Sequence, residues 1–278
     1  MRIARLEQYG LLHVAGEDAR AFLHAQLTND VENLAPRTAR YAGWCSAKGR
    51  LLATFLVVPS PDGFLLQLSC DLVPAVAKRL SMFVFRSKVK ISDATGQWAQ
   101  YGLWGPASGD PLSVNESDGS IAIRIEPDRS LIFDPRPSDN RYSPNTSPED
   151  WALAEIRAGR ALIVQSLQDQ FVPQMVNLEL AGGVDFKKGC YPGQEIVARA
   201  QYRGAVKRRM VRLRGAAMQA GQEIYSDDMP GQASGTVVNA AGGELLAVLQ
   251  VSAIEAGSPI RAQPGATALE VLPLPYSP

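Results

Sequence analysis

Apolar residues recur in short runs along the first 104 residues, and their spacing predicts antiparallel strands. We expect strands at residues 11–14, 39–45, 51–58, 64–69, 88–91 and 98–104. Pro59-Ser60-Pro61-Asp62-Gly63 is typical of a tight turn between two of these runs, because Pro and Gly favour turn conformations. This part of the chain is therefore expected to be rich in hairpins.

Two helices are predicted among these strands. Three apolar side chains between residues 22 and 27 fall on one face of the first helix. Asp71 is expected to cap the second, which runs to about Phe83 and tolerates Pro74 in its first turn. The order strand, helix, strands, helix, strand is typical of a ferredoxin-like β-α-β arrangement, and we predict the α+β class.

The pattern changes after a further strand expected at residues 121–133, with a break in it. Four prolines between residues 134 and 148 indicate a surface linker. Ser147 then favours the start of a helix from Pro148 to Ala158, with acidic residues in its first turn and Gly159 at its end. Trp151 falls in the first turn of this helix.

The last third of the chain has short β-rich runs separated by glycine-containing turns. The runs at residues 206–213, 235–239, 245–251 and 268–272 predict a small antiparallel barrel or sandwich. We therefore divide the chain into an N-terminal region (1–135), a central segment (136–204) and a C-terminal barrel (205–278).

Composition adds a charge pattern to this outline. The 278 residues have a formal net charge of zero, but the window from Lys187 to Arg214 carries +8 and the rest of the chain −8. A global field that draws nucleic acid or an anionic membrane is therefore excluded. The longest apolar run, Leu51–Val58, is too short to span a bilayer. We expect a cytoplasmic protein without membrane partners.

The basic window also contains the most distinctive chemistry. Gly189 and Gly193 flank Cys190-Tyr191-Pro192, so a tight loop is expected to hold the thiol in a defined place. Lys187 and Lys188, if they lie near the sulfur, favour the thiolate.

Purely structural interpretations of the cysteine and of the basic residues stay open. A lone cysteine is often a small packed apolar residue, and basic runs are usually solvated surfaces. A cysteine–histidine nucleophilic site is disfavoured, because His13 and His24 are the only histidines and neither has an evident orienting carboxylate. Three widely separated cysteines without a C-x-x-C pair support neither a disulfide framework nor a resident metal.

The segment K-G-C-Y-P-G-Q-E, Lys188 to Glu195, resembles the signature of the YgfZ family of folate-binding proteins, which share their fold with the glycine-cleavage T-protein. The resemblance extends over nearly the full length of the chain. It includes residues 22–31 (FLHAQLTNDV), 47–50 (AKGR), 151–159 (WALAEIRAG), 171–209 and 272–277 (LPLPYS).

This resemblance implies a T-protein-like fold: ferredoxin-like elements around a central folate cavity, followed by a β-barrel. It implies tetrahydrofolate or a derivative as cofactor, and a role in iron–sulfur cluster assembly or repair that affects tRNA modification. Assembly or client proteins would then be partners. Residues implied for folate are Trp151, Tyr9, Asn177, Tyr191 and Glu195, and those of the motif site are Lys188, Gly189, Cys190, Tyr191, Gly193, Gln194, Glu195 and Arg199.

Cys190 is the expected functional thiol and a candidate transient ligand of a cluster. Thiolate is a soft ligand that suits iron–sulfur chemistry. Because clusters normally take four thiolates, a single cysteine has to share one with a partner. No permanently bound metal is expected.

Two other functions stay open. A folate-dependent aminomethyl or one-carbon transferase is disfavoured, because Ala53 and Thr54 stand where the T-protein is expected to carry carboxylates, although Asp30 or Glu195 could substitute in space. The sequence therefore leaves open whether the protein is an enzyme and leans against it. An RNA-binding module is indicated by the basic window with Tyr191 and Tyr202, but the balanced total charge argues against a stable nucleic-acid complex.

Overall fold

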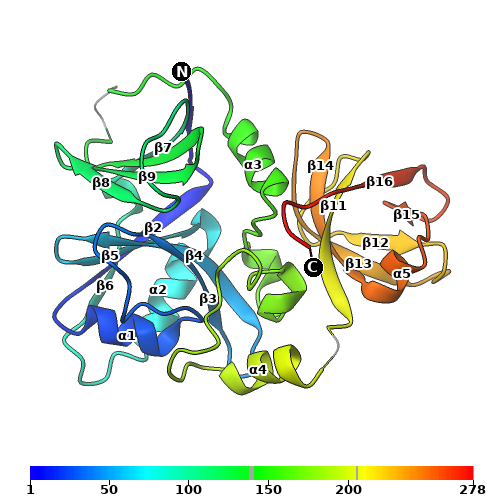
Figure 1. The fold of residues 1–278 in the computed structure, drawn as a ribbon, viewed down its shortest axis with the longest axis horizontal. Helices are drawn as coiled ribbons and strands as arrows, with labels where there is room; N and C mark the ends of the chain where they lie inside the picture. Colours follow the sequence, from blue (N-terminus) through cyan, green and yellow to red (C-terminus); the bar gives the residue numbers. More distant parts are fainter. Residues whose placement is uncertain (138–140, 205, 278) are drawn as a thin grey trace.

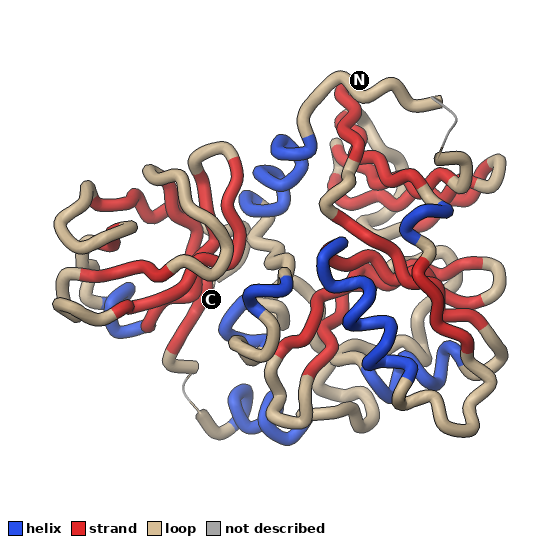
Figure 2. The backbone as a smooth tube through the Cα atoms, turned by 180° about the vertical axis from the view of Figure 1, so that it is seen from behind, coloured by secondary structure: helices blue, strands red, loops and turns tan. Residues whose placement is uncertain are grey.

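The chain forms two antiparallel sheets that pack against each other and a β-barrel on the far side of helix α3 (Pro148–Arg157) (Figure 1). The structure is a computed structural model, and it describes residues 1–137, 141–204 and 206–277. The rear view shows α3 lying between the sheets and the barrel (Figure 2). No helix among these residues is long and apolar enough to cross a membrane.

The first sheet confirms most of the strands expected from the hydrophobic pattern. Its order is β3-β4-β5-β2-β6, and every neighbouring pair is antiparallel. Its strands and helices are β2 (Tyr9–Ala15), α1 (Ala19–Gln26), β3 (Arg40–Cys45), β4 (Leu51–Ser60), β5 (Gly63–Ser69), α2 (Val73–Ser81) and β6 (Lys90–Asp93). The apolar faces of α1 and α2 pack on this sheet, as expected for an α+β fold.

Asp71 does not cap α2 as predicted. It lies in the short 3-10 turn η1 (Cys70–Leu72), and Leu72 precedes the helix. Its carboxylate instead accepts a hydrogen bond from the backbone N of Gln165, 2.9 Å away. The residue therefore joins this sheet to the segment that follows α3.

The second sheet contains the strands expected at 98–104 and 121–133, and the break expected in the latter is the turn between β9 and β10. Its order is β1-β7-β10-β9-β8, again antiparallel throughout. Its strands are β1 (Arg2–Arg5), β7 (Ala99–Trp104), β8 (Val114–Ser117), β9 (Ser120–Glu126) and β10 (Arg129–Asp134). β1 and β8 were not predicted, because four-residue strands at a sheet edge leave little periodic pattern. The linker prediction at 134–148 partly falls outside the described residues.

Helix α3 begins as predicted. The Ser147 hydroxyl accepts a hydrogen bond from the backbone N of Glu149 at 3.1 Å, and Pro148 occupies the first turn. After α3 the chain passes through η3 (Gln165–Leu167) and η4 (Pro173–Val176) to helix α4 (Gln194–Tyr202). The sequence pattern did not predict α4, since Val197 is its one fully buried side chain.

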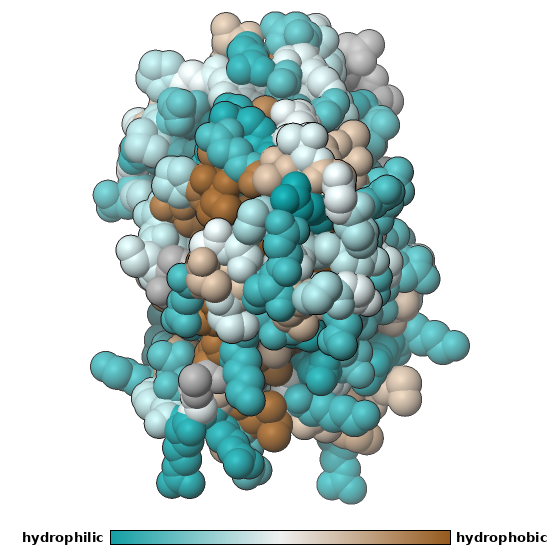
Figure 3. All heavy atoms as spheres, turned by 90° about the vertical axis from the view of Figure 1, so that its right-hand side faces the viewer, coloured by the Kyte–Doolittle hydropathy of each residue, from teal (hydrophilic) through white to brown (hydrophobic). Residues whose placement is uncertain are grey.

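The predicted C-terminal barrel is confirmed as a closed six-stranded one. Its strand order is β11-β14-β13-β12-β15-β16. The strands are β11 (Arg208–Arg214), β12 (Glu223–Ser226), β13 (Ala233–Ala241), β14 (Glu244–Gln250), β15 (Ile260–Arg261) and β16 (Ala268–Leu272), with helix α5 (Val251–Glu255) between β14 and β15. Viewed from the barrel end, the surface is mostly hydrophilic with scattered apolar groups (Figure 3).

One hydrophobic cluster crosses the boundaries drawn from sequence. It joins buried residues of the first sheet to Phe171 and Leu178 of the central segment and to Met210 and Leu246 of the barrel. A second cluster fills the space between the two sheets and includes Trp151. The central segment is therefore held from both sides by apolar contacts.

Lys188 fastens the motif loop to the end of α1. Its ammonium donates hydrogen bonds to the carbonyl oxygens of His24 and Leu27, the latter at 2.7 Å, and lies 4.9 Å from the centroid of the Tyr191 ring. These carbonyls belong to the helix end, where such groups lack partners within the helix. Burial is the main cause that lowers the pKa of Lys188 to about 8, although nearby Asp30 and Asp185 act to raise it.

The close approach of Trp151 to strand β7 requires a glycine. A Cβ atom on Gly102 would lie 2.1 Å from Cε3 of the Trp151 ring, whereas one on Gly96 would have no neighbour within 4 Å. We expect Gly102→Ala to lower the free energy of unfolding by about 1–3 kcal/mol through overpacking, and Gly96→Ala to change it by less than about 0.5 kcal/mol. Urea denaturation measures both. Equal stability of the two variants would contradict this packing.

The buried ammonium of Lys188 predicts a pH dependence. The unfolded chain keeps the lysine proton to about pH 10, whereas the folded chain releases it near pH 8. The unfolded state therefore binds more protons between these values, and this residue's contribution to stability rises with pH. The unfolding free energy of the wild type, measured relative to Lys188→Met, should increase from pH 7 to pH 10. The exposed neighbour variant Lys187→Met should show no such trend against the wild type.

Candidate functional site

A central cavity lies where the two sheets meet α3. It encloses about 650 Å³ of empty space, counting the part that opens to solvent. Its lining comes from both sheets, from α3 and from the central segment: Tyr9, Tyr41, Thr54, Phe55, Leu56, Gln67, Ile125, Leu131, Trp151, Glu155, Arg160, Ala161, Leu162, Val176, Leu178 and Ala181. Largely apolar cavities with a few convergent polar groups are typical of small-molecule sites.

Four aromatic residues contribute to this lining: Tyr9, Tyr41, Phe55 and Trp151. The Trp151 ring meets Trp104 edge to face at a centroid distance of 5.5 Å, and the guanidinium of Arg129 lies 4.6 Å from its centroid. One face of Trp151 is covered by Arg129, and the other aromatic rings of the lining are those of Tyr9, Tyr41 and Phe55. The backbone of Tyr9 is fixed by Gln100, whose Nε2 donates to its carbonyl oxygen at 2.9 Å.

Two arginines and two glutamates form a partly buried ion-pair network beside these rings, in which Arg129 is buried and the other three are partly exposed. Arg129 contacts both oxygens of Glu126 at 2.9 Å and Oε1 of Glu155 at 2.8 Å. Arg160 contacts Oε1 of Glu126 at 2.7 Å and both oxygens of Glu155 at 2.8 and 2.9 Å. The four charges cancel. They also tie the β9–β10 hairpin to α3.

The network fixes protonation states at the cavity. Burial acts to raise the pKa of Glu155, but Arg160 and Arg129 outweigh it and the net shift is downward. Burial is the main cause that raises the pKa of Tyr9 and brings that of Tyr41 to about 12. The cavity therefore presents a charged carboxylate as acceptor and two neutral phenols at neutral pH.

The structure brings together some of the predicted folate residues and not others. Trp151 and Tyr9 both line the cavity, but Asn177, Tyr191 and Glu195 are not among its lining side chains. Asn177 donates to the backbone O of Met210 at 2.9 Å and so holds the central segment on the barrel. Tyr191 is buried beside Lys188, and Glu195 is exposed on α4.

The carboxylates considered as substitutes for Ala53 and Thr54 do not line the cavity either. Thr54 lines it, but its hydroxyl donates to the carbonyl of Ala161 and accepts from the backbone N of Ile163. Asp30 lies 3.1 Å from Nδ1 of His24, outside the lining set. The carboxylate at the cavity is Glu155, which sequence reasoning missed even though it lies within the recognised W-A-L-A-E-I-R-A-G stretch.

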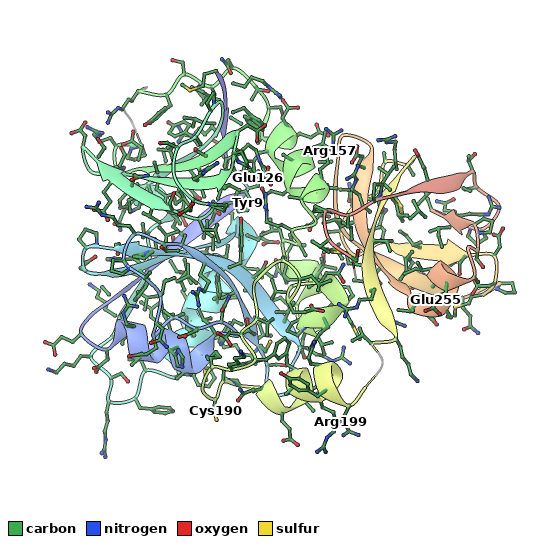
Figure 4. All side chains as sticks on the ribbon, in the orientation of Figure 1. Tyr9, Glu126, Arg157, Cys190, Arg199 and Glu255 are labelled. Carbon is green, nitrogen blue, oxygen red and sulfur yellow. The ribbon has the colours of Figure 1, made fainter. Side chains whose placement is uncertain are left out.

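The motif residues form a separate site at the surface. Cys190 is exposed, as is Cys70, whereas Cys45 is buried. Figure 4 shows Cys190 and Arg199 along the lower edge of the molecule, away from Tyr9 and Glu126. Among the described residues, no cluster of three His, Cys, Asp or Glu side chains suits a metal ion.

Two sequence motifs meet at this surface. A Cβ atom on Gly193 would lie 2.4 Å from the carbonyl O of Ser46, and one on Gly49 would lie 2.8 Å from the Cβ of Ile196. The 47–50 turn therefore packs on the start of α4 through glycines. Gln194 donates to the carbonyl O of Gly189 at 3.4 Å, which closes the Cys190 loop from the other side.

Only part of the +8 window is left at the surface. Arg209 pairs with Glu179, and both Arg212 and Arg214 pair with Glu244. Exposed basic residues remain near and beyond the motif loop: Lys187, Arg199, Arg203, Lys207 and Arg208. None of these five forms an ion pair within the described part of the chain.

Comparison with solved structures supports the architecture. The glycine cleavage system aminomethyltransferase T from Bartonella henselae superposes with a TM-score of 0.73, covering 90% of this chain and 78% of its own. The two sequences are 16% identical, so the likeness concerns the fold. The T-protein-like fold predicted from sequence is confirmed.

Sequence comparison identifies the family. A family model described as the GCVT N-terminal domain matches residues 3–122. The tRNA-modifying protein YgfZ of Klebsiella pneumoniae is 29% identical over 100% of this chain and 93% of its own. An uncharacterized protein of Haemophilus influenzae is 31% identical over 98% and 97% of the two chains. The tRNA-modifying protein YgfZ of Vibrio vulnificus strain YJ016 is 31% identical over 78% and 71%. The chain therefore belongs to the YgfZ family.

Proposed function

We propose that this protein binds tetrahydrofolate or a derivative in the central cavity and acts as an accessory protein in iron–sulfur cluster assembly or repair, and thereby in tRNA modification. The observation that carries the proposal is the cavity itself: aromatic side chains and one charged carboxylate around an enclosed space in a T-protein-like fold. The names of the relatives, tRNA-modifying proteins, support the cellular role.

The chemistry of the lining fits a reduced pteridine. Such a ring system has a broad face for aromatic contact and an edge that carries amino and ring N–H donors. The Tyr9 and Tyr41 rings can pack on the face. Glu155 accepts three hydrogen bonds or ion-pair contacts from the arginines, which leaves about one of its four lone-pair sites for a ligand donor.

The same arrangement disfavours aminomethyl transfer. A base for this reaction has to accept a proton, but Glu155 is held charged by two guanidinium groups. Thr54 is engaged with backbone groups and supplies no carboxylate. The cavity residues are therefore proposed to bind and orient the folate and to exclude water from its ring.

Cys190 is proposed as the thiol that meets an iron–sulfur partner. It stands exposed in a loop held by Lys188 on one side and by Gln194 on the other. Lys187 in the same loop and Arg199 on α4, along the same edge of the molecule, are exposed cations that suit an acidic protein surface (Figure 4). A cluster at this position would need further thiolates from a partner.

Tyr9 provides a test of folate binding. Isothermal titration calorimetry with tetrahydrofolate should give saturable binding to the wild type. Tyr9→Leu should weaken the affinity by about fivefold, because the loss of an aromatic contact costs about 1 kcal/mol, while Tyr9→Phe should retain it within about threefold. Tyr225→Leu, on barrel strand β12, is the matched control and should bind like the wild type. Absence of binding by the wild type would refute the proposed ligand.

The two exposed thiols provide a test of the cluster role. Cys190→Ser should abolish the restoration of a cluster-dependent enzyme in cells that lack this protein, whereas Cys70→Ser should restore it fully. Both variants should unfold at the wild-type urea concentration, since neither thiol is buried. Full restoration by Cys190→Ser would remove the thiol from the mechanism.

A further inference from the structure

An exposed apolar group follows helix α2, on residues 82–87, which we call the apolar loop. Phe85 is 84% exposed, the highest fraction among the large apolar side chains of the described residues. Met82 is 69% and Phe83 38% exposed. Single apolar side chains at a surface are ordinary, but several gathered together are typical of an interaction site. Three within four residues therefore point to a partner.

The apolar loop has a defined conformation. The backbone N–H groups of residues 82–84 donate to the carbonyl groups three residues earlier, at 3.1–3.2 Å. At the other end of the loop, the backbone N of Lys88 donates to the carboxylate of Asp18 at 2.7 Å. The exposed side chains of Met82 and Phe85 are thus presented on a fixed backbone. Such preorganisation lowers the entropy that a binding surface loses when its partner docks.

The charged residues on either side of this loop are all basic. No acidic residue occurs between Asp71 and Asp93. The same stretch contains five exposed cations: Lys78, Arg79, Arg86, Lys88 and Lys90. Lys88 pairs with Glu17, whereas the other four form no ion pair among the residues that the structure describes. Apolar groups flanked by cations complement an apolar pocket within an acidic surface.

The apolar loop and the Cys190 loop are both connected to the end of α1. Phe83 meets the buried ring of Trp44 edge to face at a centroid distance of 6.4 Å, and Trp44 forms a β-bridge with Leu27. Lys188, from the Cys190 loop, donates to the carbonyl O of the same Leu27 at 2.7 Å. Both α1 and Cys190 lie at the lower edge of the molecule in Figure 4. A protein interface of ordinary size, with about twenty residues on each side, can therefore cover both loops.

We propose that Met82, Phe83 and Phe85 dock a protein partner with an apolar pocket in an acidic surface, and that this partner is the one that meets Cys190. The second part rests on the proposed function. The apolar side chains supply affinity, and the cations around them steer the acidic partner into place. An anionic membrane also matches apolar and basic groups, but it gives no role to the thiol loop at the same helix end. We therefore favour the protein.

Photo-cross-linking tests whether one partner covers both loops. With p-benzoylphenylalanine at position 85 or at position 187 of the full chain in living cells, both positions should cross-link the same acidic protein, identified by mass spectrometry. Adding Phe85→Ser should lower the cross-link yield at position 187 about tenfold, the usual effect of truncating a central interface residue. Val271→Ser is the matched control, since Val271 is an apolar side chain on barrel strand β16 and is 58% exposed. It should leave the yield unchanged.

Phe85→Ser should also keep the wild-type urea midpoint and tetrahydrofolate affinity, because the side chain is exposed and lies outside the central cavity. A loss of either would mean a structural role and overturn the docking role. An unchanged yield at position 187 in the Phe85→Ser protein, or different proteins at positions 85 and 187, would overturn it as well.

Two other occupants have their own signatures. Cross-links between two copies of this chain, or sedimentation with phosphatidylglycerol vesicles that depends on Phe85, would replace the protein partner and overturn the inference. Full restoration of the cluster-dependent enzyme by Cys190→Ser would refute the proposed thiol role, and the second part of the inference with it. Loss of restoration by Cys190→Ser together with an unchanged cross-link yield would overturn the docking surface alone.

Discussion

The partly buried network of Arg129, Glu126, Arg160 and Glu155 is the interaction on which the site depends. It connects the β9–β10 hairpin to α3 and to the turn that follows, and two of its members line the central cavity. Taking the Arg129 guanidinium out of water is costly, and removing its glutamate partners would leave a buried charge without compensation. The network is therefore expected to be stable only when all four charged side chains are present. It therefore fixes the distance between the second sheet and α3, which sets the width of the central cavity.

Neutrality of this network has a consequence for the cavity. Because the four charges cancel, they add no net charge that would attract an anion, and polar groups in the cavity act through directed hydrogen bonds beside aromatic contact. Glu155 has about one acceptor position left for a donor group. The five exposed basic residues of the window lie outside the lining of this cavity.

Much of the fold could be predicted from local patterns, and the failures have physical causes. The ten residues of β4 are apolar almost throughout, and α3 has a cap, a proline and first-turn acids, so each is specified by its own sequence. Helix α4 is stabilised by glycine-mediated packing against the 47–50 turn, which no periodicity within the helix reveals. Asp71 resembles a cap locally, but its carboxylate is used by Gln165, ninety-four residues away.

The parts of the site that could be predicted are single residues within recognised motifs. The ion pairs between distant segments could not be predicted. Tyr9 and Trp151 were identified by resemblance and lie together in the cavity. Glu155 and Arg160 were missed because their partners, Glu126 and Arg129, come from a hairpin about thirty residues earlier, and no short motif contains both halves.

Lys188, which the sequence placed in the motif site, makes structural contacts that the motif alone does not reveal. Its ammonium donates hydrogen bonds to the carbonyl groups at the end of α1, so its positive charge lies against a helix end and not in solvent. This anchor explains how an exposed cysteine can be held in a defined place. A loop with an exposed thiol is held in place by its neighbours, and a long side chain reaching into a helix end supplies one while Cys190 stays exposed. The fixed conformation of this loop therefore depends on the groups beside Cys190, and above all on the Lys188 ammonium.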